Sequence, residues 1–351
     1  MRCKAPVLLV VLCSMPGLLL AQARPPVVEP ILDMHLHARK ADYIGPDPPP
    51  MCAPFAMMPR WDNSKPDMDG FTFNTMPPCA EPIMPAATDE AVMGDTLAVM
   101  RKRNIIGMVS GEPELVKAWK AAAPERVIVG LDLRLGGDGA QAHVKPRTPA
   151  ELRAMYQRGE FQVLGEVMAQ YEGIAADDPR LEPYWALAEE LDIPVGIHMG
   201  SGGPGDPYFG SPGFRARNSS ALRLEEVLVR HPELRVYMMH AGYPLLDDLR
   251  AVMFAHPQLY VDISMIVYAE PRPAFYRYLQ ELVDAGYGDR VMFGSDQMIW
   301  PGVIEPAIQA IEDATFLSAE QKRDILYNNA ARFLRLSEVQ IKAHHQWGRH
   351  Q

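Results

Sequence analysis

The most constraining feature of this sequence is a series of short apolar runs that each carry a histidine or a carboxylate near the C-terminal end. The runs and these residues are ILDMHLH with His35 and His37, FQVLGEV with Glu166, PVGIHMG with His198, RVYMMHAG with His240, and RVMFGSD with Asp296. Each run has the length and the β-branched content of a strand that is buried on both faces. In a parallel barrel the loops after the strands form the active-site mouth, so we expect these side chains to converge there.

Eight candidate strands alternate with candidate helices along the chain. The strands are expected at 31–37, 105–111, 127–134, 161–167, 194–200, 235–242, 259–265 and 290–296. Two of the intervening helices begin with a capping box, one at Thr148 and one at Ser318. A strand–helix unit repeated eight times predicts an α/β fold, the (β/α)8 barrel. An open, doubly wound sheet is the competing architecture, but the sequence has no Gly-x-Gly-x-x-Gly turn to support it.

A long proline-rich insertion, residues 38–87, interrupts this alternation after the first strand. Long irregular loops in a compact domain are usually functional or disordered, and the aromatic residues in this one favour an ordered, lid-like segment. It contains Cys52 and Cys79, which in an oxidising compartment are expected to form one disulfide. Two unpaired thiols are the alternative.

The N-terminal residues 1–23 have the features of a secretory signal: basic residues, a short apolar stretch, and the small-x-small triplet Ala-Gln-Ala at 21–23. We therefore expect an exported protein, periplasmic or secreted, although an uncleaved anchor is an alternative. The barrel is expected to occupy 24–338, and 339–351 to form a frayed polar tail. The histidines of this tail are His344, His345 and His350.

The charge of the chain narrows the choice of partners. The 351 residues carry a formal net charge of −10, and removal of the basic signal makes the mature chain more acidic still. An acidic surface argues against binding to nucleic acid or to an anionic membrane. A small-molecule substrate is the expected partner, with a homo-oligomer as a further option and no stable membrane insertion after signal cleavage.

The converging side chains are suited to binding a metal. Alternate residues of one strand share a face, so His35 and His37 can both point into the barrel. His198 and His240 can reach the same centre from across the mouth, and Asp296 lies next to the first strand in a closed barrel. Zinc would lower the pKa of a bound water from about 15.7 towards about 7. A single buried histidine is more often a core residue than a ligand, so the argument depends on the ordered series.

The motifs DMHLH, GIHMG, MHAGYP and FGSD, with NNAARFLRL near the end, resemble the amidohydrolase superfamily, and specifically its amidohydrolase-related branch. The resemblance implies that His35, His37, His198 and Asp296 bind a catalytic divalent metal, expected to be zinc. It implies a proton-transfer role for Asp296, and for His240 either a second ligand position or acid–base catalysis. One metal ion is favoured; a second ion bridged by Glu166 is the alternative.

The resemblance leaves the reaction open. We expect an exported hydrolase that cleaves an amide, ester or lactone of a small organic substrate. A non-oxidative decarboxylase of an aromatic or enoic acid is the alternative, and a binding barrel without turnover is a third. Candidate substrate-binding residues lie in loops expected at the mouth. They are Arg134, Arg215, Arg217, Tyr268 and Trp300.

Overall fold

The computed structural model describes residues 28–65, 71–72, 79–136 and 145–348, and within them eight parallel strands form one sheet. In sheet order these are β1 (Ile31–Ala38), β4 (Ile105–Gly111), β5 (Val127–Leu133), β6 (Val163–Val167), β7 (Val195–His198), β8 (Val236–Met239), β9 (Tyr260–Asp262) and β10 (Val291–Met292). Sequence order and sheet order are the same throughout. This is the order of a barrel, in which no strand is skipped.

The segment that follows β10 brings the last strand back to β1. The Met34 N–H donates to the Phe293 carbonyl over 2.9 Å, the Asp296 N–H donates to the His35 carbonyl over 2.7 Å, and the His37 N–H donates to the Gln297 carbonyl over 2.9 Å. The predicted (β/α)8 barrel is therefore confirmed, and the open, doubly wound sheet is excluded.

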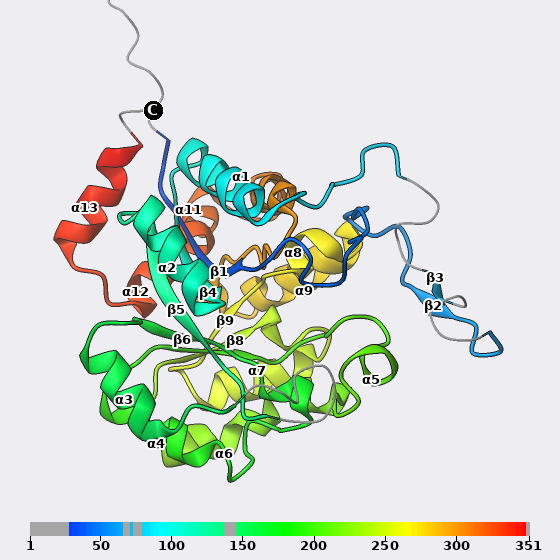
Figure 1. Ribbon diagram of the computed structural model, residues 1–351. Helices are drawn as coiled ribbons and strands as arrows, with labels where there is room; N and C mark the ends of the chain where they lie inside the picture. The colour runs from blue at the N-terminus through cyan, green and yellow to red at the C-terminus, as the bar shows by residue number, and fades with distance from the viewer. Residues whose placement is uncertain (1–27, 66–70, 73–78, 137–144, 349–351) are drawn as a thin grey trace, which may run out of the picture.

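Helices connect the strands and cover the outside of the barrel (Figure 1). The α-helices are α1 (Asp89–Lys102), α2 (Pro113–Ala122), α3 (Pro149–Gln157), α4 (Glu182–Glu190), α5 (Asp206–Phe209), α6 (Leu222–Arg230), α7 (Leu246–Ala255), α8 (Ile266–Ala269), α9 (Arg272–Asp284), α10 (Ile304–Glu312), α11 (Ala319–Arg323), α12 (Asn329–Phe333) and α13 (Glu338–Trp347). Shorter helical turns are η2 (Ala169–Glu172), η3 (Ala216–Ser219), η4 (His240–Gly242), η5 (Gly288–Arg290), η6 (Pro301–Val303) and the π-helical η7 (Asp324–Asn328). Both predicted capping boxes are present, at the starts of α3 and α11.

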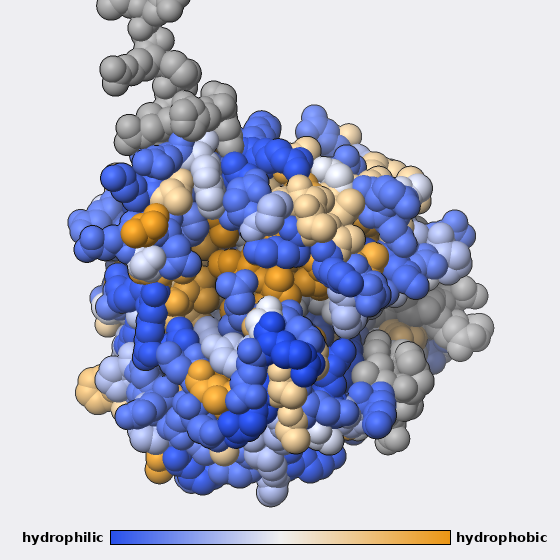
Figure 2. Space-filling view, turned by 60° about the vertical axis from the view of Figure 1, so that its left-hand side comes forward, coloured by the Kyte–Doolittle hydropathy of each residue, from blue (hydrophilic) through white to orange (hydrophobic). Residues whose placement is uncertain are grey.

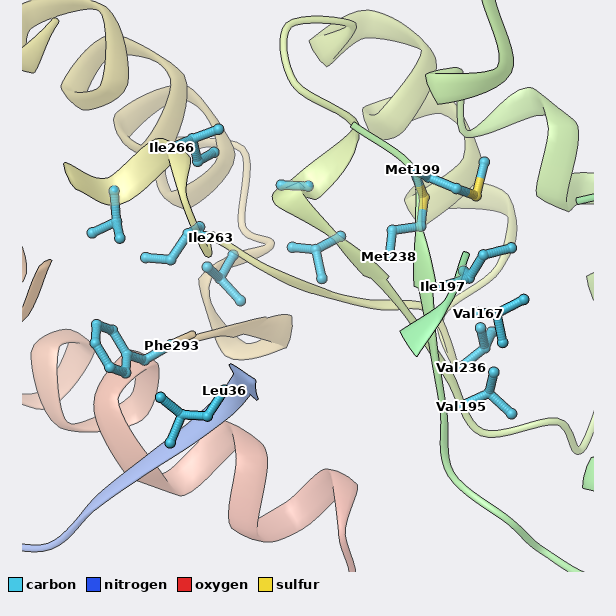
Figure 3. Packing of buried hydrophobic residues seen from close by; sticks show 14 of the residues in the cluster. Leu36, Val167, Val195, Ile197, Met199, Val236, Met238, Ile263, Ile266 and Phe293 are labelled. Atoms are coloured by element: carbon cyan, nitrogen blue, oxygen red, sulfur yellow. The ribbon is translucent and has the colours of Figure 1, made fainter. Parts of the chain in front are cut away.

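Two apolar clusters hold the barrel together. The larger lies between the strands and the surrounding helices; in it, Val195 of β7 and its register partner Val236 of β8 pack on the outer face (Figure 3). The smaller cluster includes Leu32 and Met34 of β1. Leu36 belongs to the outer cluster, and the β1–β4 register shifts between Asp33 and Leu36. Before the irregularity, Leu32 and Met34 face the inside of the barrel. After it, His35 and His37 can face the inside instead of Leu36.

The two ends of the barrel differ in what covers them. The insertion and α5 lie at one end, and α12 and α13 lie at the other (Figure 1). A hollow of about 740 Å³ opens between α2, α3 and α13, and its lining includes Ile128, Val163, Leu334 and Trp347. Figure 2 shows apolar side chains gathered in a hollow near the middle of that side of the molecule. None of the histidines and carboxylates singled out in the strands lines this hollow, so the site must be sought at the other end.

A disulfide and main-chain hydrogen bonds join parts of the insertion to one another and to the barrel. Cys52 and Cys79 form a disulfide with a Cα–Cα distance of 5.7 Å, as predicted. Main-chain bonds of 2.8 Å run in both directions between Met51 and Ile83, and the Phe55 N–H donates to the Ala269 carbonyl over 2.8 Å. The strands β2 (Arg60–Trp61) and β3 (Phe71–Thr72) pair in an antiparallel, two-stranded sheet that forms the outer part of the insertion.

The later strands are shorter than the sequence indicated. The strands β8, β9 and β10 end before His240, Met265 and Asp296, and each of these three residues has a positive φ: 60°, 60° and 51°. Non-glycine residues rarely adopt this conformation.

The expectation of a frayed C-terminal tail is wrong for most of its length. Residues Glu338–Trp347 form α13, which starts with a third capping box between Ser337 and Gln340. The His344 side chain is buried, with its Nδ1 2.9 Å from the Tyr327 hydroxyl. His350 and the predicted signal 1–23 lie outside the described residues. Within the described part of the chain, no helix combines the length and the apolar character needed to cross a bilayer.

Candidate metal centre

Four buried side chains meet above the barrel interior. The Nε2 atoms of His35 and His37, both from β1, are 3.1 Å apart. Asp296 Oδ1 lies 3.2 Å from His37 Nε2 and 3.6 Å from His35 Nε2. Glu166 Oε2, from β6, lies 3.6 Å from His37 Nε2 and 3.9 Å from His35 Nε2. Two imidazole nitrogens of β1 thus lie within 3.9 Å of carboxylate oxygens from two other parts of the barrel.

A second group of potential ligands adjoins the first and shares one member with it. Atoms of Glu166, His198 and His240 all lie within 4.8 Å of one another. The rings of His198 and His240 are 4.7 Å apart, and those of His35 and His240 are 5.3 Å apart. His198 therefore lies with His240 rather than directly beside the β1 histidines, and Glu166 stands between the two groups.

Hydrogen bonds fix which imidazole nitrogens can bind a metal. His240 Nδ1 is 3.0 Å from the Ser264 carbonyl, which can only accept, so this nitrogen carries the proton. His35 Nδ1 is 2.8 Å from Ser264 Oγ and 3.4 Å from Asp262 Oδ2. Ser264 Oγ donates its own proton to Asp262 and is then an acceptor for His35 Nδ1–H. Both rings thereby keep the Nε2 lone pair free, which is the arrangement that ligation needs.

His198 is oriented in the same way by the turn after β6. The Gln170 amide nitrogen donates to the Gly200 carbonyl over 3.1 Å, which leaves its Oε1 as an acceptor 2.8 Å from His198 Nδ1. His198 Nε2 then has a free lone pair, and the Tyr171 hydroxyl lies 2.8 Å from it. Tyr171 is thus placed where it can donate to His198 or contact a ligand bound beside it.

Burial and a neighbouring guanidinium favour the neutral form of His37. Its Nδ1 is 3.2 Å from Arg39 Nη2 and 3.3 Å from Ser110 Oγ. Arg39 is buried and pairs with Asp132 at 2.8 Å. Burial and the adjacent guanidinium lower the pKa of His37, and a neutral imidazole is the form that binds metal. Because a guanidinium can only donate, His37 Nδ1 is the acceptor of the contact with Arg39, and the opposite nitrogen, Nε2, faces Asp296 Oδ1 at 3.2 Å.

The spacing and charge of the first group fit a divalent cation. Nitrogen or oxygen ligands about 2.1 Å from a tetrahedral zinc are about 3.4 Å apart, close to the distances between these atoms. Burial lowers the pKa of His35, but Asp296, Asp262 and Glu166 outweigh it and raise the pKa well above its usual value. The negative potential that stabilises a proton on His35 also attracts a metal ion. A histidine–carboxylate set of this kind suits zinc or another first-row divalent ion.

Asp296 links this cluster to open space. Burial raises the pKa of Asp296, but the charge of His35 and a hydrogen bond from His37 lower it to about 2, so the carboxylate is ionised. Asp296 and His240 both line a cavity of about 490 Å³. A substrate in this cavity meets a carboxylate and an imidazole at its inner end.

The walls of this cavity are mainly apolar and come from several loops. The insertion contributes the segment from Ile44 to Pro59, including Phe55 and Met58, and the opposite wall includes Tyr268 and Trp300. The Trp300 indole N–H donates to the Pro49 carbonyl over 3.0 Å, which joins the insertion to the wall. The insertion therefore forms part of the cavity.

A family model for amidohydrolases matches residues 32–336. The chain belongs to the amidohydrolase family. It is an enzyme of the metal-dependent amidohydrolase type, and the match spans the barrel from β1 to the loop after α12. A search among curated proteins finds no significant match.

Solved structures with the same fold include enzymes of different reaction types. The 4-oxalomesaconate hydratase from Rhodopseudomonas palustris is 17% identical with a TM-score of 0.54, covering 89% of this chain and 98% of the other. The 5-carboxyvanillate decarboxylase from Sphingomonas paucimobilis is 16% identical with a TM-score of 0.53, covering 88% and 100%. A probable 2-pyrone-4,6-dicarboxylic acid hydrolase from Acinetobacter baumannii is 13% identical with a TM-score of 0.53, covering 87% and 99%. At these identities the similarity shows the fold alone.

The predicted substrate-binding residues of this amidohydrolase divide into two sets. Tyr268 and Trp300 line the cavity, whereas Arg134, Arg215 and Arg217 are not among its lining residues. Arg215 instead donates to the carbonyls of Pro212 and Phe214 over 2.8 and 2.6 Å. A role for the three arginines in binding substrate stays a prediction.

Several polar residues of the site were not singled out from the sequence. They are Arg39, Ser110, Asp132, Gln170, Tyr171, Asp262 and Ser264. Asp262 had a signal, because it is a carboxylate within the seventh strand run, and β9 ends at it. Asp33 acts on the main chain: its Oδ1 accepts from the N–H groups of His35 and Ser295 over 3.0 Å each. The residue beside the His35 ring is Asp262.

Proposed function

We propose that this amidohydrolase is an exported zinc hydrolase that cleaves a C–N or C–O bond in a small amide, ester or lactone. The observation that carries the proposal is the position of Asp296. Its carboxylate lies 3.2 Å from His37 Nε2 and also lines the cavity, so one ionised group belongs to both the ligand cluster and the substrate space. Hydrolysis needs a base at such a boundary.

The chemistry divides between the metal and the residues of the chain. When bound, a divalent metal acts as a Lewis acid that polarises a carbonyl and makes water more acidic. His35, His37 and Asp296 would hold it, with Glu166 and His198 beside them. Asp296 is placed to accept a proton from the attacking water. His240, which lines the same cavity with its Nε2 lone pair free, is placed to ligate or to move a proton to the leaving group.

One metal ion is the favoured content, as in the branch that the motifs resemble. The position of Glu166 between the two ligand groups supports the alternative of two ions, because a carboxylate can bridge them. Export is supported by the basic and apolar features of residues 1–23 and by the Cys52–Cys79 disulfide, which is typical of oxidising compartments.

A decarboxylase is the second candidate, supported by the similarity in fold to 5-carboxyvanillate decarboxylase. The two reactions differ in their products, so one panel separates them. The metal-loaded protein should hydrolyse members of a set of esters, amides and lactones and should release no carbon dioxide from aromatic carboxylic acids. The reverse pattern would replace the hydrolase with a carboxy-lyase.

The site assignment is tested with matched histidine variants. His35→Ala and His37→Ala should lose both metal and activity while circular dichroism stays that of a folded barrel. His256→Ala removes a histidine at the end of α7, outside the ligand groups, and should keep both properties. Normal metal content and full activity in His35→Ala would refute the assignment.

A further inference from the structure

Glu270, a second carboxylate on the cavity wall, has no role in the metal site. It follows α8, is only 7% exposed, and lines the same cavity as Asp296 and His240. Its Oε2 accepts a hydrogen bond from the Tyr243 hydroxyl over 3.0 Å. Among the described residues Tyr243 is its one hydrogen-bond partner, and no described lysine or arginine forms an ion pair with it.

This carboxylate is poorly satisfied for its surroundings. An ionised carboxylate has about four acceptor positions, and one phenol occupies one of them. Burial among apolar side chains disfavours the charge and raises the pKa of Glu270, although the Tyr243 hydroxyl counteracts this. The Oε1 atom accepts no hydrogen bond from a described residue and is not fully enclosed, so a donor that enters the cavity can reach it.

The position of Glu270 is held rigidly. The Tyr243 ring packs edge-on against Tyr278 with a centroid distance of 5.0 Å, and the Tyr278 hydroxyl donates to the Ala241 carbonyl over 2.7 Å. Tyr243 and Tyr278 thereby connect Glu270 to the turn that carries His240. A fixed acceptor of this kind selects ligands by geometry, because little conformational entropy is lost when a donor binds to it.

The charge of the cavity wall also favours some substrates over others. Two carboxylates, Asp296 and Glu270, line it, and none of the described lining residues is a lysine or an arginine. A substrate with a second negative charge would approach Glu270 without a compensating cation. A neutral or positively charged group would not meet this repulsion.

We propose that Glu270, positioned by Tyr243, is the specificity-determining residue of the cavity and binds a hydroxyl or ammonium donor on an apolar, non-anionic substrate. This inference deepens the proposed hydrolase function. The reaction at the metal end rests on that proposed function, whereas the binding preference at Glu270 does not. The apolar body of the substrate would lie between Phe55, Tyr268 and Trp300, with the carbonyl at the metal end and the donor at Glu270.

Four probes that differ only in their far substituent test this preference. They are methyl benzoate and its 4-hydroxymethyl, 4-aminomethyl and 4-carboxylate derivatives. Binding to the metal-loaded protein is measured by calorimetry, and hydrolysis by chromatography as kcat/KM. The wild type should bind a donor-bearing ester about tenfold to a hundredfold more tightly than the 4-carboxylate, the range of a charge-assisted hydrogen bond. The better of the two donor probes identifies the donor as hydroxyl or ammonium.

Three variants assign the preference to Glu270. Glu270→Gln should weaken the 4-aminomethyl ester at least tenfold, change the 4-hydroxymethyl ester less than threefold, and strengthen the 4-carboxylate ester. Glu270→Leu should weaken both donor probes. Tyr243→Phe should weaken them by a smaller factor, because the carboxylate remains but is less well fixed. Glu281→Gln, on the exposed face of α9, is the matched control and should bind every probe as the wild type does.

The outcomes separate this inference from the proposed function. Equal binding of all four probes, tighter binding of the 4-carboxylate by the wild type, or the same preference in Glu270→Leu would overturn it. A preference for donors that disappears in Glu270→Leu supports it, even if no ester is hydrolysed. In that last case the hydrolase proposal alone fails.

Discussion

Replacement of Ser264 most directly tests how the imidazole rings of the candidate metal site are held in their orientations. The Ser264 hydroxyl is fully buried, 2.8 Å from His35 Nδ1 and 3.1 Å from His240 Nδ1, and it donates to Asp262. In Ser264→Ala the His35 ring keeps only the Asp262 Oδ2 contact of 3.4 Å. His240 keeps the main-chain carbonyl at 3.0 Å. Ser264→Ala should therefore weaken the orientation of the His35 ring strongly and that of the His240 ring only slightly.

The size of the effect follows from these contacts. Loss of a hydrogen-bond partner behind a metal-binding histidine typically lowers metal affinity by about 10- to 100-fold. This corresponds to about 1.4–2.7 kcal/mol. The cost in folding free energy should be about 1 kcal/mol, because Asp262 Oδ1 still accepts two main-chain N–H groups. Metal affinity should thus fall by more than stability does.

The assay is a competitive metal titration against a chelator, with thermal unfolding measured on the same samples. Thr96→Val is the control, since the Thr96 hydroxyl is buried in α1 and has no hydrogen-bond partner among the described residues. It should leave metal affinity unchanged. If Ser264→Ala binds zinc within twofold of the wild type, the orientation of His35 does not depend on this hydroxyl and the reasoning is refuted.

Three further outcomes are expected. Replacing Cys52 and Cys79 by serine should destabilise the insertion by about 3.5 kcal/mol, the entropy of closing a loop over the 27-residue separation, and free-thiol titration of the exported protein, without residues 1–23, should detect no cysteine before reduction. Elemental analysis should find one zinc per chain, retained in Glu166→Gln with slower turnover; two ions in the wild type and one in the variant would instead show that Glu166 bridges. Burial lowers the pKa of His344 to about 4 from 6.5, so its contribution to stability is complete above about pH 6.5 and is lost as the pH falls towards 4. The melting temperature of the wild type should fall across that interval more than that of His344→Gln, and parallel curves would contradict this.

The barrel and the cluster of candidate ligands could be predicted because they depend on local patterns. Runs rich in β-branched residues indicated all eight strands. The alternation of side chains along a strand restricts a histidine or carboxylate near its end to one of two faces. His35, His37, Glu166 and Asp296 therefore converge as expected, with the shortest contacts at 3.1–3.2 Å. The irregularity in β1 that turns His35 inward after Met34 has no such local signal.

The residues that orient the ligands could not be predicted in the same way. Gln170, Tyr171 and Ser264 lie in turns, and their partners come from other parts of the chain, so their roles depend on tertiary packing. The C-terminal helix is a different case. Its capping box at Ser337 and Gln340 has the same pattern as the boxes at α3 and α11, so the sequence did contain the signal.

The insertion has a consequence for how enzymes of this kind can diversify. It leaves the barrel immediately after β1, which carries His35 and His37, and returns to it just before α1. Its residues from Ile44 to Pro59 form a large part of the cavity wall, yet none of them belongs to a metal-ligand group. One wall of the cavity is thus encoded in a stretch of sequence that is adjacent to the β1 histidines but separable from them. Exchange of this segment, with its disulfide, would reshape that wall while leaving Glu270 and the metal-ligand groups in place.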